Sequence, residues 1–278
     1  MQSVSTIRDL RLALLKWREA GETVAFVPTM GALHEAHLSL VREAKKSSKR
    51  VVASVFVNPL QFGPKEDFKT YPRQLDKDQQ LLSEAGCDLL YSPTSDEMYT
   101  RDFSTKIDPG PMATILEGAF RPHFFYGVST VVMKLLLQVM PDIAFFGEKD
   151  YQQLLIIQRI VYDLDLPVHI VGLPIVRDTD GLALSSRNAY LSSDERKRAV
   201  ALPNTLKSCI EKMIKGETVD TALKAGRAQL EAAGFTVDYL ELADSQNLLS
   251  LKELRAPARL LAAARIGSTR LIDNMAVE

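Results

Sequence analysis

The sequence is poor in the features that mark several common protein classes. Its 278 residues include only two cysteines, Cys87 and Cys209, and neither belongs to a Cys-x-x-Cys pair. This scarcity argues against a disulfide framework and a cysteine-rich zinc site, and it favours a reducing, cytoplasmic location. No apolar run reaches the roughly 18 residues typical of a membrane-spanning helix, so we expect no association with a membrane.

The sequence also lacks an excess of charge of one sign and lacks two common nucleotide-binding motifs. Lys and Arg number 34 against 35 Asp and Glu, for a net charge of −1. This balance gives no electrostatic support to a nucleic-acid partner. Neither the dinucleotide fingerprint Gly-x-Gly-x-x-Gly nor the phosphate loop Gly-x-x-x-x-Gly-Lys-[Ser/Thr] occurs, which argues against NAD and P-loop chemistry.

Strand and helix patterns alternate through the first two thirds of the sequence. Nearly continuous apolar strands, such as 51–57, are typical of parallel sheets that are covered on both faces. The repeated β-then-α order predicts an α/β fold with a doubly wound, Rossmann-like parallel sheet. The strands are expected at 24–27, 51–57, 88–91, 142–147, 168–171 and 174–176, and the helices at 33–44, 75–85, 127–140 and 150–164.

The pattern changes beyond the polar stretch 177–188. Two helices are predicted at 193–215 and 219–233, followed by strands at 235–242, 258–266 and 271–277. We therefore expect two domains. Residues 1–184 are predicted to form the Rossmann-like domain, and residues 185–278 a smaller C-terminal α+β domain that acts as a lid.

The segment 27–37, VPTMGALHEAH, joins a predicted strand to a predicted helix through a turn at Pro28 and Gly31. His34 and His37 lie three residues apart, so both imidazoles should share one helix face. The helix N-terminus offers backbone N–H groups and a positive dipole end, which favour phosphate. The segment predicts a nucleoside triphosphate site.

Three other interpretations of the histidine pair are open. The side chains could lie on a solvated helix face, form half of a zinc site, or belong to an ordinary crossover turn. Zinc is the weakest of these, because the His-Glu-x-x-His signature and a further ligand cluster are both absent.

Three further polar clusters are candidates for ligand binding. Asn58 and Gln61 follow a strand and offer uncharged donors and acceptors, although Asn-Pro is also a common loop opening. The segment 147–150, GEKD, follows another strand and brings a lysine suited to phosphate. The segment 185–188, SSRN, supplies hydroxyls and a guanidinium, which binds phosphate oxygens in a bidentate manner.

Taken together, these segments resemble the pantoate–β-alanine ligase family, within the nucleotidyltransferases that carry the HIGH motif. The resemblance runs in the expected order over nearly the entire chain, through PTMGALHEAHLSL, FVNPLQFGP, YPR, LEG, FFGEKDYQQL, LALSSRN and TRLIDN.

The resemblance implies a ligase that uses ATP in two steps. The pantoate carboxylate would attack the α-phosphorus of ATP to give a pantoyl adenylate and pyrophosphate. The β-alanine amine would then displace AMP and form pantothenate. Such chemistry depends on positioning and charge stabilisation rather than on a protein nucleophile. Mg²⁺ is expected with ATP, and a homodimer is expected as the assembly.

The resemblance also implies roles for individual residues. Catalysis would involve His34, His37 as proton donor, Lys149, Ser185, Ser186 and Arg187. Contacts with ATP are expected from Met30, Gly31, Ala32, Leu33, His34, Glu35, Ala36, His37, Gly147, Glu148, Lys149, Asp150, Val176, Leu184, Ser185, Ser186 and Arg187. Gln61 and Gln153 would hold pantoate, Gln61 would also border β-alanine, and Asn58, Pro28 and Thr29 would add substrate contacts.

No side chain is expected to bind metal directly. Asp76 and Asp78 follow the YPR segment, but they are better explained as acids of a first helical turn than as Mg²⁺ ligands. Two other functions compete with the ligase: a nucleotidyltransferase with another acceptor, and a nucleotide-binding protein without turnover. Retention of the histidine pair and of Lys149 argues against the second.

The sequence departs from the family pattern at several positions. Ala36 stands where glycine is usual, and Leu184 where methionine is common. In the stretch 121–127, RPHFFYG, the histidine lies one place early. A methyl group at Ala36 would narrow the approach of ATP to the helix backbone.

Replacing Ala36 by glycine is therefore expected to lower the KM for ATP. Steady-state rates measured with varied ATP test this expectation. An unchanged KM in the Ala36→Gly variant, beside an ordinary KM in the natural protein, would show that the methyl group does not impede ATP.

Overall fold

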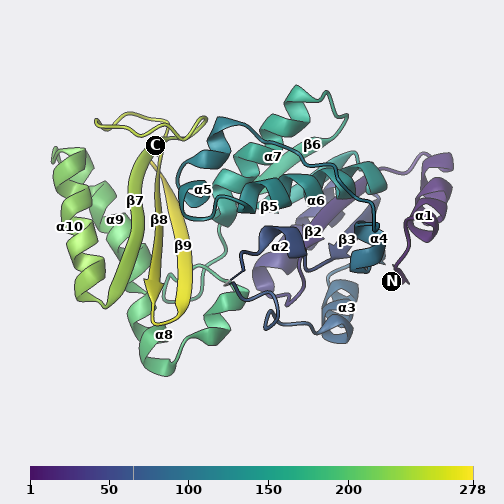
Figure 1. Ribbon diagram of the computed structural model, residues 1–278, viewed down its shortest axis with the longest axis horizontal. Coiled ribbons are helices and arrows are strands. Elements are labelled where there is room, and N and C mark those ends of the chain that lie inside the picture. Colours follow the sequence, from purple (N-terminus) through teal and green to yellow (C-terminus); the bar gives the residue numbers. More distant parts are fainter. Residues whose placement is uncertain (65, 278) are drawn as a thin grey trace. The chain divides into compact units, whose positions relative to one another are not determined.

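The computed structural model describes residues 1–64 and 66–277. Contacts between residues divide the chain into two units, Met1–Glu148 with Ile156–Pro174, and Lys149–Leu155 with Ile175–Glu278. Figure 1 shows a large sheet with helices in the first unit and a small sheet with helices in the second. The predicted boundary between residues 184 and 185 falls inside the second unit, because Arg177 and its neighbours contact the C-terminal strands.

The first unit holds the larger sheet. Its strands are β1 (Gln2–Val4), β2 (Val24–Thr29), β3 (Arg50–Val55), β4 (Leu89–Tyr91), β5 (Ile143–Gly147) and β6 (His169–Leu173). Its helices are α1 (Ile7–Glu19), α2 (Glu35–Ser47), α3 (Leu75–Glu84), α4 (Ser95–Met98), α5 (Glu117–Phe120) and α6 (Phe124–Val139), with the 3₁₀ turns η1 (Pro59–Gln61) and η2 (Pro111–Thr114). The turn η3 (Glu148–Asp150) leads into α7 (Tyr151–Asp163).

The six strands are all parallel, in the order β1-β4-β3-β2-β5-β6. Chain order reverses between β2 and β5, where Ala25 pairs with Ile143. Open α/β sheets bind ligands outside the carboxyl ends of the strands at such a switch point. The predicted doubly wound, Rossmann-like sheet is confirmed, and β1 is an edge strand beyond the prediction.

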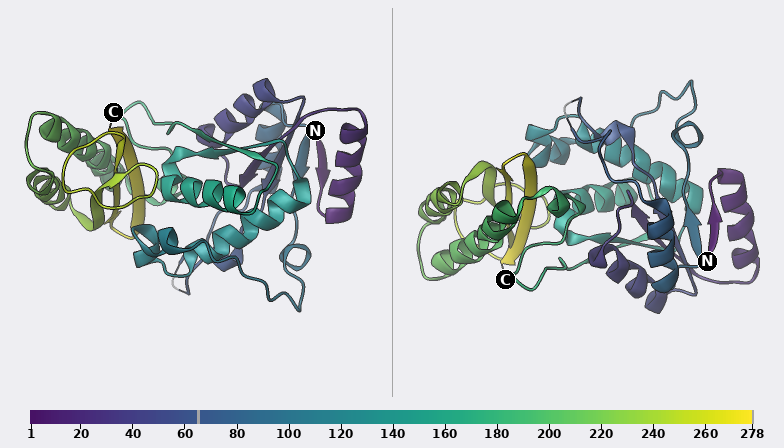
Figure 2. Two further views of the ribbon diagram at one scale, coloured as in Figure 1. Left: turned by 90° about the horizontal axis from the view of Figure 1, so that it is seen from above. Right: turned by 90° about the horizontal axis from the view of Figure 1, so that it is seen from below.

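Helices cover both faces of this sheet, as the two views in Figure 2 show. On one face, Val41 of α2 and Leu82 of α3 pack against β-strand residues such as Val51. On the other face, α6 lies close enough for the Tyr91 hydroxyl to donate to Gln138 Oε1 at 3.0 Å. Burial on both faces explains why the strands are nearly continuous apolar runs.

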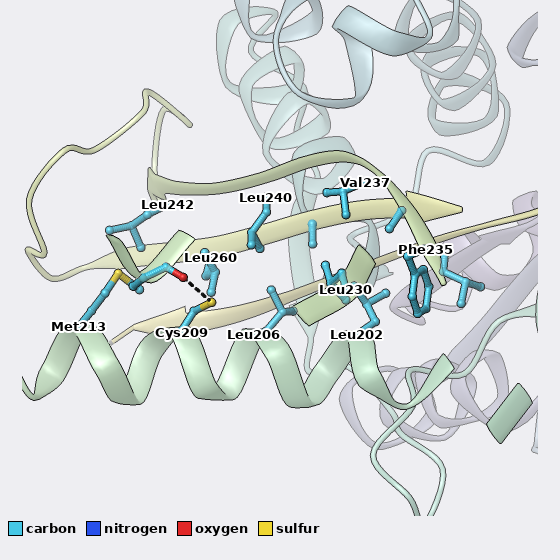
Figure 3. Packing of buried hydrophobic residues seen from close by; sticks show 14 of the residues in the cluster. Leu202, Leu206, Cys209, Met213, Leu230, Phe235, Val237, Leu240, Leu242 and Leu260 are labelled. Carbon is cyan, nitrogen blue, oxygen red and sulfur yellow. Dashed lines mark hydrogen bonds between the residues drawn. The ribbon is translucent and has the colours of Figure 1, made fainter. Parts of the chain in front are cut away.

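The second unit has an antiparallel sheet in the order β7-β8-β9. Its elements are η4 (Ser186–Tyr190), α8 (Ser193–Ala199), α9 (Ala201–Ile214), α10 (Val219–Ala232), β7 (Phe235–Asp244), β8 (Ala258–Ile266) and β9 (Thr269–Val277). Figure 3 shows Leu202, Leu206, Cys209 and Met213 on one face of α9, packed toward the strands. This helical stripe and sheet confirm the predicted α+β character.

Two predictions about the second part of the chain are wrong. The helix expected at 193–215 is broken at Val200, because Pro203 lacks the N–H that would bond to Ala199 and its ring would crowd that carbonyl. The strand expected at 174–176 does not form. Only an isolated bridge between Arg177 and Ala183 follows β6 there.

Both cysteines are buried and carry free thiols. Cys87 packs in the core, as predicted, and burial raises the pKa of its thiol to about 12. Burial also raises the pKa of Cys209. These protonated thiols are poor nucleophiles. Among the described residues, no helix has the length and apolar character needed to cross a bilayer.

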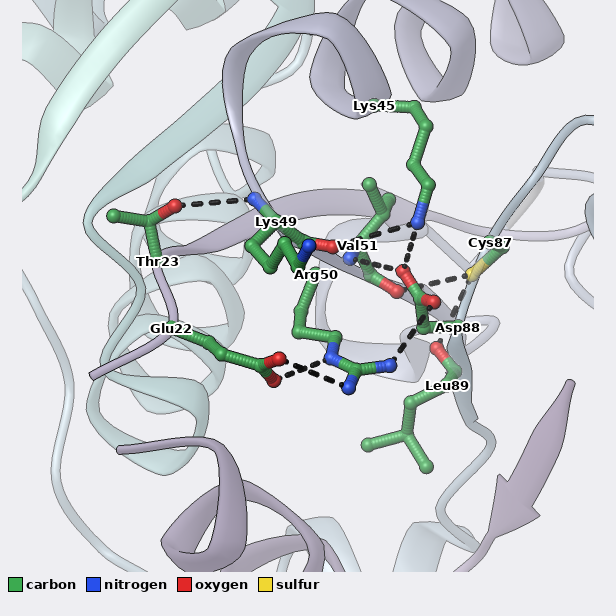
Figure 4. A network of polar contacts seen from close by, with 9 residues as sticks. All are labelled: Glu22, Thr23, Lys45, Lys49, Arg50, Val51, Cys87, Asp88 and Leu89. Carbon is green, nitrogen blue, oxygen red and sulfur yellow. Dashed lines mark hydrogen bonds and ion pairs between the residues drawn. The ribbon is translucent and has the colours of Figure 1, made fainter. Parts of the chain in front are cut away.

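A polar network joins the amino ends of β2, β3 and β4 (Figure 4), away from the carboxyl ends at which open α/β sheets bind ligands. Arg50 donates two hydrogen bonds to Glu22, at 2.5 and 3.1 Å, and its NH1 lies 3.6 Å from Asp88 Oδ1. Asp88 Oδ2 accepts from Lys45 Nζ and from the backbone N–H of Val51, each at 2.8 Å. The network therefore ties the strand ends together.

The Arg50 hydrogen bonds hold the pKa of Glu22 below its usual value. The ion pair thus stabilises the fold above the ordinary carboxyl pKa, and this stabilisation is lost as the pH falls through the lowered value. Glu22→Gln is expected to lower the Tm at about pH 7 and to differ less from the natural protein at about pH 3. Thermal unfolding at both pH values measures this. An equal Tm difference at the two pH values contradicts it.

Candidate active site

The turn between β2 and α2 lies at the carboxyl end of β2. Gly31 (φ +81°) and Ala32 (φ +53°) both have left-handed backbone conformations. A Cβ at Gly31 would lie 2.9 Å from Asp78 Oδ2 and 3.0 Å from Val55 Cγ1, so space as well as φ requires glycine. The Thr29 hydroxyl donates to the Ser54 carbonyl at 2.7 Å and accepts from the Gly31 N–H at 3.2 Å.

Asp78 of α3 holds this turn from the interior. Asp78 is only 1% exposed. Its two carboxylate oxygens accept hydrogen bonds from the backbone N–H groups of Ala32 (3.0 Å) and Leu33 (2.9 Å). Gln74 Nε2 adds a third contact at 3.4 Å. Asp78 does lie in the first turn of α3, as predicted. Its contact with a turn 45 residues away had no signal in the sequence.

His34 and His37 lie together where α2 begins. Their ring centroids are 4.2 Å apart with a 42° angle between planes, so the two imidazoles lie side by side as predicted, although His34 is the N-cap residue of α2 and has extended backbone. The backbone N–H of His34 donates a hydrogen bond to His37 Nδ1, with 3.4 Å between the two nitrogen atoms. A neutral His37 ring with an accepting Nδ1 carries its proton on Nε2. The pair therefore places a ring donor beside the N–H groups of a helix N-terminus.

Asn58 lies three residues after β3, where it caps the turn η1, and is 1% exposed. Its Oδ1 accepts from the Tyr99 hydroxyl (2.8 Å) and the Leu60 N–H (3.2 Å). Its Nδ2 donates to Gln61 Oε1 (3.0 Å) and to the Gly127 carbonyl (3.1 Å). All four hydrogen bonds of the Asn58 amide are thus made within the protein, which gives Asn58 a positioning role. The predicted contact of Asn58 with substrate stays a prediction.

The Gln61 side chain contacts the turn between β2 and α2. Its Nε2 lies 3.0 Å from Met30 Sδ. Gly127 of α6 permits this arrangement, because a Cβ there would lie 2.2 Å from the Leu60 carbonyl oxygen. Two segments predicted to bind substrates, 28–37 and 58–61, therefore meet at the carboxyl ends of β2 and β3.

The stretch 121–127, which departs from the family pattern, contacts the backbone of Gln61. Arg121 NH2 donates to the Gln61 carbonyl at 3.3 Å, and its guanidinium forms two hydrogen bonds with the Glu66 carboxylate, at 2.7 and 2.6 Å. Phe124 takes the place where the family has histidine, and its ring centre lies 3.7 Å from the Arg121 guanidinium carbon. A cation–π contact thus occupies that position.

In the second unit, the C-terminal strands hold the segment that carries Lys149. Asn274 of β9 donates from Nδ2 to the Lys149 carbonyl at 3.0 Å and accepts from Arg259 Nε at 2.6 Å. The Arg259 guanidinium lies 3.8 Å from the centre of the Tyr151 ring, and the Tyr151 hydroxyl donates to the Ser245 carbonyl at 2.9 Å. This is a structural role for the asparagine of the TRLIDN segment.

The neighbouring Asp273 holds the segment that precedes Ser185. Its carboxylate is 1% exposed and accepts two hydrogen bonds from Arg177, at 2.7 and 2.9 Å. Ser185 Oγ accepts from the Arg187 N–H at 3.3 Å and caps η4. The ion pair between Arg177 and the buried Asp273 thus holds the segment that leads to the predicted phosphate-binding cluster 185–187. The sequence alone did not reveal this link.

The other predicted residues fall into the same two groups. In the first unit, Gly147 ends β5 and Glu148 begins η3, at the carboxyl end of β5. In the second, Leu184 N–H donates to the Val176 carbonyl at 3.0 Å, so these two predicted ATP contacts lie side by side. Asp150 closes η3, and Gln153 lies in the first turn of α7.

Comparison with known proteins places this geometry in a family. The sequence model described as pantoate-beta-alanine ligase matches residues 2–276. The chain belongs to the pantoate–β-alanine ligase family. A pantothenate synthetase from Nitrobacter winogradskyi is 51% identical, with 99% of this chain and 98% of that protein covered.

Solved structures agree. Pantothenate synthetase from Thermus thermophilus gives a TM-score of 0.94 at 50% identity, with 99% of both chains covered. A pantoate-beta-alanine ligase from Francisella tularensis, complexed with beta-gamma ATP and beta-alanine, gives 0.84 at 33% identity, with 99% of this chain and 97% of that chain covered.

Asp78→Asn tests the turn. An amide can accept from only one of the two backbone N–H groups and presents a donor to the other, so we expect a loss of about 1–3 kcal/mol in unfolding free energy. We also expect a raised KM for ATP. Asp76→Asn, on the exposed side of the same helical turn, is the control and should change stability by less than about 0.5 kcal/mol. Equal effects of the two variants would contradict this role of Asp78.

Proposed function

We propose that this protein joins pantoate to β-alanine, with ATP activating the pantoate carboxylate as an acyl adenylate. The observation that carries the proposal is the His34–His37 pair at the N-terminus of α2, beside the switch point of a Rossmann-like sheet. This pair lies in a chain that matches the ligase family from residue 2 to residue 276.

In the first step, a pantoate carboxylate oxygen bonds to the α-phosphorus of ATP. The bond from that phosphorus to the bridging oxygen breaks, and pyrophosphate leaves with the electron pair. Negative charge grows on the phosphate oxygens, and preorganised donors stabilise it most effectively. His37 Nε2–H, His34 and the N-terminus of α2 are proposed to supply these donors in the first unit.

Further cationic and hydroxyl groups lie in the second unit. Lys149, Ser185, Ser186 and Arg187 are proposed to contact the phosphates, while Val176, Leu184 and the segment 147–150 are proposed to contact ATP. Two hydrogen bonds support this assignment: that from Asn274 holds the Lys149 carbonyl, and that from Arg177 to Asp273 holds the segment that leads to Ser185.

In the second step, the β-alanine amine attacks the acyl carbonyl of the adenylate. The carbonyl carbon forms an amide bond, the amine loses a proton, and AMP leaves with the electron pair of the broken C–O bond. Gln61 and Gln153 are proposed to hold pantoate through both steps, so that the carbonyl stays in place for the amine.

Mg²⁺ is proposed to arrive bound to ATP. The described residues contain no group of three or more His, Cys, Asp or Glu side chains placed to hold an ion. Asp78 is also occupied, because its oxygens accept from Ala32 and Leu33. ATP phosphates and water suit Mg²⁺, which binds few protein groups in such sites and neutralises phosphate charge.

We also propose a cytoplasmic homodimer. The two buried free thiols fit a reducing compartment, and symmetric dimers are the commonest protein oligomers. Sedimentation equilibrium of the purified protein measures the assembly.

Exchange of labelled pyrophosphate into ATP, with β-alanine absent, tests the adenylate. We expect exchange that requires pantoate and falls by about 10²-fold or more in His37→Ala. ATP binding without pantoate-dependent exchange would contradict the proposal. It would favour another acceptor or a nucleotide-binding protein without turnover.

Gly147 offers a second test. It ends β5, its φ is not left-handed, and a Cβ there would meet no atom within 4 Å. Gly147→Ala should therefore leave the Tm nearly unchanged. If ATP passes close to this backbone, the methyl group raises the KM for ATP and leaves the KM for pantoate as it was. Unaltered kinetics would remove Gly147 from the ATP site.

A further inference from the structure

We propose that Tyr99 is a positioning residue for substrate recognition, because its hydroxyl fixes Asn58 and Asn58 in turn fixes the amide of Gln61. The inference rests on the proposed function for the identity of the substrate. Tyr99 follows α4, and its hydroxyl lies 2.8 Å from Asn58 Oδ1. In the sequence, Tyr99 is 41 residues from Asn58 and outside every segment that predicted the site.

The orientation of the Asn58 amide is set by two backbone groups. The Leu60 N–H can only donate, so the atom that it meets at 3.2 Å is the oxygen Oδ1. The Gly127 carbonyl can only accept, so the atom that it meets at 3.1 Å is the nitrogen Nδ2. Reversing the amide would place donor against donor and acceptor against acceptor.

The orientation of Gln61 follows from that of Asn58. Asn58 Nδ2 donates to Gln61 Oε1 at 3.0 Å, which uses the Gln61 oxygen inside the protein. Gln61 Nε2 is then the end that lies 3.0 Å from Met30 Sδ. A thioether is a weak acceptor, so a hydroxyl or carboxylate oxygen of a substrate can replace it at little cost. Gln61 therefore recognises oxygen acceptors by donating N–H.

Tyr99 supplies the shorter of the two hydrogen bonds to Asn58 Oδ1. Burial raises the pKa of the Tyr99 hydroxyl, so it stays protonated and donates at neutral pH. The ring is held independently: its centre lies 5.0 Å from that of Phe103 and 6.1 Å from that of Phe56, with Lys134 Nζ at 5.9 Å. Removing the hydroxyl should leave the ring in place and loosen Asn58.

Tyr91 provides a control. It is fully buried, whereas Tyr99 is half-buried, and its hydroxyl likewise donates to a side-chain amide oxygen, Gln138 Oε1, at 3.0 Å; burial raises the pKa of Tyr91 as well. Gln138 bonds onward to Met98 Sδ at 3.7 Å rather than to Asn58 or Gln61. Tyr91→Phe therefore removes an equivalent hydrogen bond and leaves intact the relay, by which we mean the hydrogen bonds from Tyr99 to Asn58 and from Asn58 to Gln61.

The experiment compares Tyr99→Phe and Tyr91→Phe in the full chain. We expect both to lower the Tm by a similar amount. Tyr99→Phe should raise the Kd and the KM for pantoate by about tenfold, the effect of losing one well-placed hydrogen bond, with the KM for ATP unchanged. Tyr91→Phe should alter neither constant. Equal pantoate constants in the two variants would overturn the role of Tyr99.

The side-chain amide signals of Gln61 separate this proposal from the proposed function. In the ligand-free protein, nuclear magnetic resonance should show these ¹⁵N–¹H signals shifted or broadened in Tyr99→Phe but not in Tyr91→Phe. If the natural protein shows no pantoate-dependent turnover, the proposed function fails, and the signals still decide the relay. Signals that match in both variants would overturn it.

Discussion

The carboxylate of Asp78 is the contact on which the site of the first unit depends. The turn after β2 must pass through left-handed conformations at Gly31 and Ala32, and such a conformation costs a non-glycine residue about 1–2 kcal/mol. Two charge-assisted hydrogen bonds from the Ala32 and Leu33 N–H groups to Asp78 offset that cost. With the turn fixed, the histidine pair lies at the start of α2, and Met30 lies beside Gln61.

The same principle recurs in both units. Buried polar side chains hold the segments that carry the proposed ligand contacts: Asn58 holds the Gln61 side chain, Asn274 holds the Lys149 carbonyl, and Asp273 holds Arg177 in the segment that leads to the 185–187 cluster. A buried polar group is costly unless its hydrogen bonds are made, so each network permits few alternative arrangements. Rigid donors of this kind suit adenylation, because they need no reorganisation when charge develops.

Local rules explain what the sequence predicted and what it did not. Apolar periodicity located β2, β5 and α6 to within a few residues, and the spacing of three residues predicted that the His34 and His37 rings lie together. Contacts between distant segments follow no spacing rule, so the links from Asp78 to Ala32 and from Tyr99 to Asn58 could not be predicted. The break at Val200 did have a signal, since Pro203 is tolerated in the first turn of a helix but not in its interior.

Hydrogen exchange at the amides of Ala32 and Leu33 tests the central claim most directly. The claim is that the turn is already fixed before any substrate binds. In the ligand-free protein, both amides should exchange far more slowly than those of an unstructured peptide, because each donates to a buried carboxylate. Exchange of both amides at the rate of an unstructured peptide would show that Asp78 does not hold the turn and would contradict the account.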